Sequence, residues 1–72
     1  MKKSTIKTME EWLDRRFTMA EQRDAEMGNT DGTEFLSNNP DYIYYKGALE
    51  MLQCAGFCWK RNVLGKHTLF TP

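Results

Sequence analysis

Long hydrophobic runs, catalytic signature motifs and an excess of either charge are all missing from this sequence of 72 residues. No apolar stretch approaches the roughly 20 residues that a membrane-spanning helix needs, so we expect no membrane partner. The basic N-terminal segment lacks the apolar core of a signal peptide, which favours a cytoplasmic protein. Ten basic and ten acidic residues give a formal net charge of zero, unlike the strongly basic domains that typically bind nucleic acids.

Cysteine and histidine are too scarce to form a familiar metal site or catalytic centre. Cys54, Cys58 and the single His67 supply three ligands, whereas a structural zinc ion needs four. The spacing of the two cysteines also differs from the C-x-x-C of thiol–disulfide oxidoreductases, and we expect free thiols in a reducing compartment. His67 has no acid or nucleophile near it in the sequence, and no phosphate-binding loop or hydrolase motif is present. We therefore expect no enzyme, no metal and no cofactor.

The clearest helix signals lie between Asn39 and Phe57. Asn39 is a favourable N-cap, and Pro40 suits the first helical position, where its missing N–H costs nothing. Gly56 suits the position after the C-cap, so these signals predict a helix over 40–55. At about 100° per residue, its apolar side chains share one arc that consists of Tyr44, Tyr45, Ala48, Leu49, Met51, Leu52 and Ala55. We expect the rest of the chain to cover this arc.

A second amphipathic helix is predicted over 8–27. Thr8 and Glu11 match the capping box, in which each side chain accepts from the backbone N–H of the other residue. Gly28 has the position of a helix-ending glycine. The acidic side chains of this helix are interpreted as a solvated face, among them Glu10, Asp14 and Glu21.

After Gly56 the pattern changes to two short β-prone runs, which predict a hairpin over 57–70. The connecting segment at 62–65 has Asn first and Gly last, as expected for a type I turn followed by a left-handed glycine. In this register Phe57, Trp59 and Leu69 share the face that should lie on the helices. The register pairs Trp59 with Leu69 and Arg61 with His67.

Together these elements predict a single α+β domain over residues 1–72, with two antiparallel helices, an anchored loop and a C-terminal hairpin. Phe35 and Leu36 are the apolar residues of the loop, and we expect one or both of them to anchor it in the core. Residues 1–7 have no clear period and leave two alternatives, a disordered arm or a short strand that joins the hairpin. The predicted core consists of Trp12, Leu13, Phe17, Phe35, Tyr45, Leu49, Leu52, Phe57, Trp59 and Leu69.

Apolar side chains outside this core point to protein binding. Tyr42 and Ile43 lie off the main arc of their helix, and Phe70 faces away from the core in the predicted register. Aromatic side chains are enriched at binding hot spots, and oligomerisation is one way to stabilise a domain this small. We therefore predict a non-enzymatic protein–protein interaction module whose partner is another protein or a second copy of the chain.

The alternative is a winged-helix-like nucleic-acid-binding protein. Helix, turn, helix and two-stranded wing would follow in that order, with 40–55 as the recognition helix. The hairpin would contact the phosphate backbone through Lys60, Arg61, Lys66 and His67. Zero net charge and an acidic first helix disfavour contact with phosphates, so we favour the protein partner.

The C-terminal segment YIYYKGALEMLQCAGFCWKRNVLGKHTLF, and within it YYKGALEML and GKHTLF, resembles small uncharacterised proteins of phages and integrated mobile elements of Gram-positive bacteria. The resemblance covers about residues 42–70 and does not extend to the first helix. It implies a cytoplasmic, non-catalytic accessory protein and assigns no functional residues.

Overall fold

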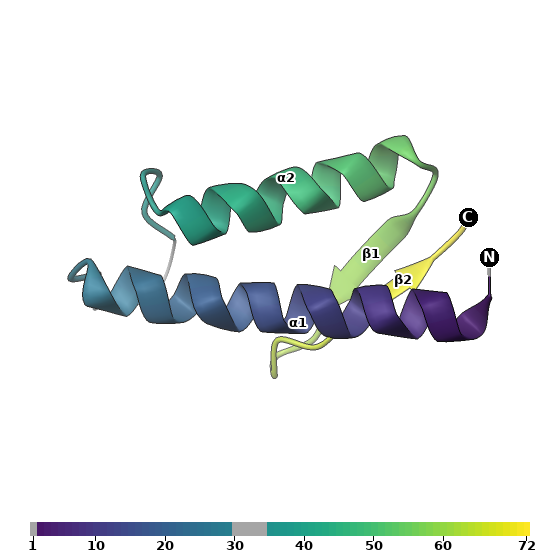
Figure 1. Cartoon of the computed structure of the whole chain (residues 1–72), viewed down its shortest axis with the longest axis horizontal. Coiled ribbons are helices and arrows are strands. Elements are labelled where there is room, and N and C mark those ends of the chain that lie inside the picture. The colour runs from purple at the N-terminus through teal and green to yellow at the C-terminus, as the bar shows by residue number, and fades with distance from the viewer. Residues whose placement is uncertain (1, 30–34) are drawn as a thin grey trace.

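Two helices and a β-hairpin follow one another along the chain (Figure 1). The computed structural model describes residues 2–29 and 35–72. Its elements are α1 (Lys3–Glu26), α2 (Pro40–Cys54), β1 (Cys58–Arg61) and β2 (His67–Phe70). The helices run antiparallel, and the strands form a two-stranded antiparallel sheet (Figure 1). The predicted α+β architecture of two helices followed by a hairpin is confirmed.

The N-terminal boundary of α1 differs from the prediction. The helix begins at Lys3, so residues 3–7 form neither a disordered arm nor a strand. The predicted capping box is also wrong, because Thr8 lies inside the helix and its hydroxyl donates to the Ser4 carbonyl at 2.9 Å. The extra turn contributes Ile6, which packs against the core. Within the described residues no side chain caps this end, which is why the sequence contains no local signal for it.

The C-terminus of α2 forms the predicted glycine cap. Gly56 has a φ of 95°, a left-handed conformation that favours glycine. The N–H of Gly56 donates to the Gln53 carbonyl and the N–H of Phe57 to the Leu52 carbonyl, both at 3.0 Å. This hydrogen-bond pair defines the Schellman motif. It turns the chain so that Phe57 enters the core and the hairpin folds back along the helices.

Asn39 links the two helices as well as capping α2. Its side-chain oxygen accepts from the N–H groups of Asp41 and Tyr42 at 3.0 and 3.1 Å. Its amide group donates to the Ala20 carbonyl at 2.9 Å and to the Asp24 carboxylate at 3.0 Å. The side chain is fully buried, so these bonds replace the water that would otherwise solvate it. One residue therefore fixes both the start of α2 and its position on α1.

Asp24 is the acidic centre of this junction. Its carboxylate accepts from the backbone N–H of Leu36 and from the side chains of Asn39 and Asn29. Burial raises the pKa of Asp24, but these hydrogen bonds outweigh burial and bring the pKa below its ordinary value. The ionised form is therefore the one that the folded protein prefers.

Asp24→Asn is expected to flatten the acid side of the stability profile. A carboxyl whose pKa is depressed by folding stabilises the protein above its unfolded pKa of about 4, and this contribution is lost as pH falls through the folded pKa. Wild type should therefore lose stability below about pH 4, while the variant is less stable at neutral pH and changes less on acidification. Thermal unfolding followed by circular dichroism from neutral to acidic pH measures both effects. Glu26→Gln, at an exposed position of the same helix, should keep the wild-type profile, and an Asp24 variant that did so would contradict the assignment.

The hairpin adopts the predicted register, with Trp59 opposite Leu69 and Arg61 opposite His67. Gly65 closes the turn with a φ of 82°. It also faces Phe17, because a Cβ at this position would lie 3.2 Å from the phenylalanine ring. The turn thus rests against α1 where a larger residue would not fit without a shift.

The acidic side chains of α1 were predicted to face solvent, but two of them bind the hairpin. Glu10 accepts from the backbone N–H of Leu69 at 2.7 Å, and Asp14 accepts from that of His67 at 2.8 Å. Both N–H groups lie on the edge of β2 that points away from β1. An unpaired strand edge leaves such groups without partners, so α1 carboxylates here take the place of a third strand.

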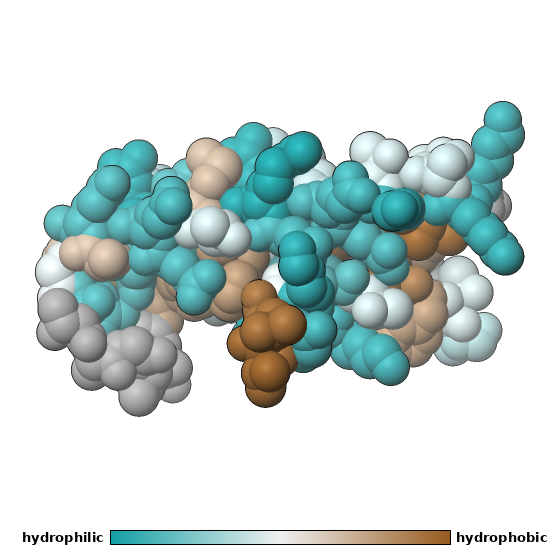
Figure 2. Space-filling model, turned by 90° about the horizontal axis from the view of Figure 1, so that it is seen from below, coloured by the Kyte–Doolittle hydropathy of each residue, from teal (hydrophilic) through white to brown (hydrophobic). Residues whose placement is uncertain are grey.

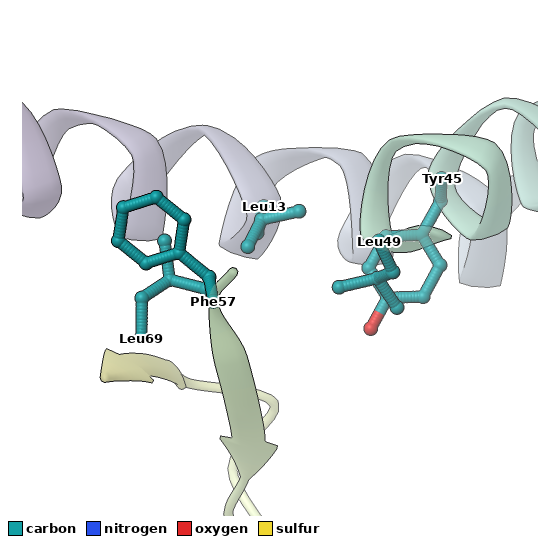
Figure 3. Packing of buried hydrophobic residues seen from close by; sticks show 5 residues of the cluster. All are labelled: Leu13, Tyr45, Leu49, Phe57 and Leu69. Carbon is teal, nitrogen blue, oxygen red and sulfur yellow. The ribbon is translucent and has the colours of Figure 1, made fainter. Parts of the chain in front are cut away.

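The core lies where the two helices and the hairpin meet. Figure 3 shows the five side chains at its centre, which are Leu13, Tyr45, Leu49, Phe57 and Leu69. Around them pack Ile6, Met9, Trp12, Phe17, Tyr42, Ala48, Leu52 and Trp59. Phe35, the remaining predicted member, contacts the rings of Phe17 and Tyr42. The predicted core is thus found, and the additions to it are Ile6, Met9, Tyr42, Ala48 and the fully buried Ala20.

Part of the apolar arc of α2 remains uncovered. Tyr45 and Leu49 are buried, but Tyr44 is 55% exposed and Met51 is 71% exposed. The expectation that the chain covers the whole arc is therefore wrong. The physical reason is size, since a two-stranded hairpin covers only one side of the helix pair and passes behind α1 (Figure 1).

Candidate functional site

An apolar groove runs between α1 and α2 beside this uncovered part of the arc. Its volume is about 410 Å³, and it is lined by Thr8, Met9, Trp12, Arg15, Ala48, Met51 and Leu52. Arg15 is the one charged residue in this lining. Contiguous apolar surface with a polar rim is characteristic of protein-binding sites. We refer to these seven residues as the helix groove.

Aromatic contacts hold one wall of the helix groove in place. The ring centroids of Trp12 and Tyr44 are 5.8 Å apart. The guanidinium group of Arg16 lies 4.5 Å from the Tyr44 ring and 5.3 Å from the Trp12 ring. Cations on aromatic faces are attracted by about 0.5–1 kcal/mol at exposed sites. These contacts restrain the Trp12 side chain, which lowers the entropic cost of binding a partner there.

The residues predicted for protein binding do not form one surface. Tyr42 is half-buried, and its ring stacks on Phe35 with centroids 4.5 Å apart, so much of it belongs to the core. Ile43 is 56% exposed beside it in the first turn of α2. Phe70 is 43% exposed but pairs with Cys58. Cys58 comes just after the C-terminal end of α2, whereas Tyr42 and Ile43 lie at its N-terminal end (Figure 1). Phe70 is therefore separated from Tyr42 and Ile43 by the length of the helix.

His67 cannot act as a phosphate contact, because its side chain has no exposed surface. Its Nδ1 lies 2.9 Å from the Asp14 carboxylate and its Nε2 lies 2.6 Å from the Tyr45 hydroxyl. Arg61 donates to the same hydroxyl at 3.2 Å. The predicted nucleic-acid set is therefore corrected to Lys60, Arg61 and Lys66. Sequence reasoning missed the network because Asp14 lies 53 residues before His67.

The network around His67 has the arrangement of a general base and the carboxylate that orients it. In the tautomer whose Nδ1–H donates to Asp14, Nε2 accepts a hydrogen bond from the Tyr45 hydroxyl. Burial raises the pKa of the Tyr45 hydroxyl, and the bond from Arg61 offsets this only in part. Tyr45 is 2% exposed, so a substrate could not reach either reactive atom without movement of the core. The burial favours a structural role for these side chains.

The tip of the hairpin carries two aliphatic side chains that sequence reasoning treated only as turn residues. Val63 is 101% exposed and Leu64 is 80% exposed. Figure 2 views the molecule from the side on which the hairpin turn lies in Figure 1, and it shows a hydrophobic protrusion on a largely hydrophilic face. Exposed basic residues Lys60, Arg61 and Lys66 lie near them in the sequence. The sequence did contain a signal for this exposed pair, because turn positions are usually occupied by polar residues and here they are aliphatic.

The described parts of the chain contain no group of three or more His, Cys, Asp or Glu residues that could hold a metal ion. Cys54 and Cys58 are not joined to one another. Within residues 2–29 and 35–72 we find no helix with the length and apolarity needed to cross a membrane. Comparison with protein-family models, with curated proteins and with solved structures gives no significant match to this chain.

Proposed function

We propose that the chain is a non-enzymatic protein–protein interaction module that binds its partner in the helix groove. The observation that carries the proposal is the exposure of Met51, which is 71% exposed and lies with Trp12 and Leu52 in a largely apolar lining. Folding alone would favour burial of these side chains. A partner that covers them gains the apolar burial that the hairpin does not supply.

The chemistry of the helix groove suits a protein partner. Methionine is flexible and adapts to different apolar surfaces, and tryptophan and arginine are enriched at binding hot spots. The partner is another protein or a second copy of this chain. We retain the cytoplasmic accessory role in a phage or mobile element as part of the proposal. In this proposal the helix groove replaces Tyr42, Ile43 and Phe70 as the binding surface.

Photocrosslinking at position 51 tests the proposal in the cells that produce the protein. With p-benzoylphenylalanine in place of Met51, we expect a discrete covalent adduct to a second polypeptide, because this side chain would be covered in the complex. The same residue in place of Gln53, exposed on α2, provides the matched control. Adduct formation is measured by denaturing electrophoresis and mass spectrometry, which also distinguishes a partner protein from a second copy.

The expected result is a product at position 51 that is at least several-fold stronger than at position 53. A further substitution, Trp12→Ala, should remove the adduct at position 51 because it deletes the opposite wall. Equal yields at the two positions, or no product at either, would contradict the proposed binding surface. Circular dichroism of each variant checks that the fold is retained.

Because His67 is buried, the winged-helix alternative depends on Lys60, Arg61 and Lys66. Their exposure is the observation in its favour. Binding through phosphates weakens steeply with salt, so titration of mixed duplex and single-stranded oligonucleotides over a range of salt concentrations tests it. Micromolar binding with a steep negative slope, lost on neutralising these three residues, would replace the protein-partner proposal.

A further inference from the structure

Hydrogen bonds hold the backbone of the hairpin turn that carries Val63 and Leu64. The Asn62 side chain accepts from the backbone N–H groups of Leu64 and Lys66 at 2.9 and 3.0 Å. The Gly65 N–H donates to the Asn62 carbonyl, and the Asn62 N–H donates to the Lys66 carbonyl, both at 3.0 Å. Four hydrogen bonds therefore fix the backbone on both sides of the tip. A fixed backbone lowers the entropic cost of inserting side chains into another phase.

The cations beside the tip differ in how free they are. Arg61 is held back, because its guanidinium lies 4.3 Å from the Phe17 ring and donates to Tyr45. Lys66 is 68% exposed, and its ammonium group is 3.9 Å from the Asp14 carboxylate. In the described part of the chain, Lys60 forms no ion pair. Lys60 and Lys66 are thus the charges that could meet an anionic surface.

We propose that the hairpin tip inserts Val63 and Leu64 into the interface of an anionic lipid membrane, with Lys60 and Lys66 at the headgroups. The aliphatic pair and the two lysines suit two layers of a membrane, its acyl boundary and its headgroups. Aliphatic side chains gain by entering the acyl boundary, and nearby lysines gain from anionic headgroups. A phosphate backbone would satisfy the lysines alone and leave the aliphatic pair in water. The charges and the apolar pair together therefore favour lipid over nucleic acid.

The inference concerns peripheral binding rather than a spanning segment. The sequence-based expectation of no membrane partner considered only helices long enough to cross a bilayer. A tip of two aliphatic residues with two cations binds weakly and reversibly, since small apolar anchors need a second, electrostatic signal. The site is separate from the helix groove, so it stands or falls independently of the proposed function.

Vesicle binding of the full chain tests the inference. The probes are vesicles of phosphatidylcholine with phosphatidylserine and vesicles of phosphatidylcholine alone, assayed by co-sedimentation at low and physiological salt. We expect binding to the anionic vesicles that weakens with salt, and at least about tenfold weaker binding without phosphatidylserine. Mixed-sequence oligonucleotides under the same conditions provide the competing anionic surface.

Two matched variants separate the apolar and electrostatic parts. Val63→Ser/Leu64→Ser keeps every charge and is expected to weaken vesicle binding about tenfold or more, because the inserted side chains are lost. Lys60→Gln/Lys66→Gln keeps the apolar pair and should weaken it about fivefold for each cation removed. All four positions are exposed, and circular dichroism checks that both variants fold.

Three results would overturn the inference. These are no binding of wild type to anionic vesicles, vesicle binding unchanged by Val63→Ser/Leu64→Ser, and tighter binding to oligonucleotides that the same variant leaves intact. The last result would assign the tip to nucleic acid. Failure of this test leaves the crosslinking result at position 51 unaffected, and the reverse also holds.

Discussion

Leu13→Ala is expected to destabilise the domain by about 3–5 kcal/mol, in the upper part of the range for buried leucines. Leu13 has no exposed surface, and it lies between α2 and the hairpin, close to Tyr45, Leu49, Phe57 and Leu69 (Figure 3). Truncation would leave a cavity bordered by three elements, which cannot all close on it together. In a domain of this size the core rarely supplies more than about 3–5 kcal/mol of stability, so the variant should be largely unfolded at 37 °C.

Thermal and urea unfolding followed by circular dichroism measure this effect. Two positions on α2 provide graded controls. Leu52→Ala should cost about half as much, since Leu52 is only half-buried, and Met51→Ala should stay within about 0.5 kcal/mol of wild type. A Leu13 variant that melts within a degree or two of wild type would show that the core is assigned wrongly.

Asp14→Ala is the second substitution with a large expected effect, about 2–4 kcal/mol of lost stability. It removes the acceptor of both the backbone N–H and the Nδ1–H of His67. A buried donor left without a partner costs about 1–3 kcal/mol, and the better helix propensity of alanine returns about 0.5 kcal/mol. The hairpin is also expected to detach from α1 more readily, because Asp14 binds the outer edge of β2.

Unfolding free energies and hydrogen exchange at residues 67–70 measure the two consequences. Glu11→Ala, at an exposed position on the same helix, should leave both unchanged. A double-mutant cycle with His67→Phe should give a coupling energy of about 1 kcal/mol or more between the two positions. If the two effects simply add, the hydrogen bond between the Asp14 carboxylate and Nδ1 of His67 does not contribute to stability.

The order and type of the elements could be predicted because their signals are local. Asn39 and Pro40 start α2, Gly56 ends it, and the Asn62–Gly65 turn sets the hairpin register, all through bonds within about five residues. The start of α1 was missed for the complementary reason. Among the described residues no side chain caps it, and Ile6 packs against a core that is assembled from distant parts of the sequence.

The candidate sites depended on contacts that no local signal encodes. His67 was assigned to the surface, yet the fold brings Asp14 and Tyr45 to either side of it from positions 53 and 22 residues away. The apolar arc of α2 was evident from its periodicity, but the arc itself does not specify which residues stay exposed. The sequence by itself determined the helices, the turns and the composition of the core. The tertiary structure decided the burial of His67, the exposure of Met51 and the position of Val63 and Leu64, because the exposure of a side chain depends on which segments pack over it.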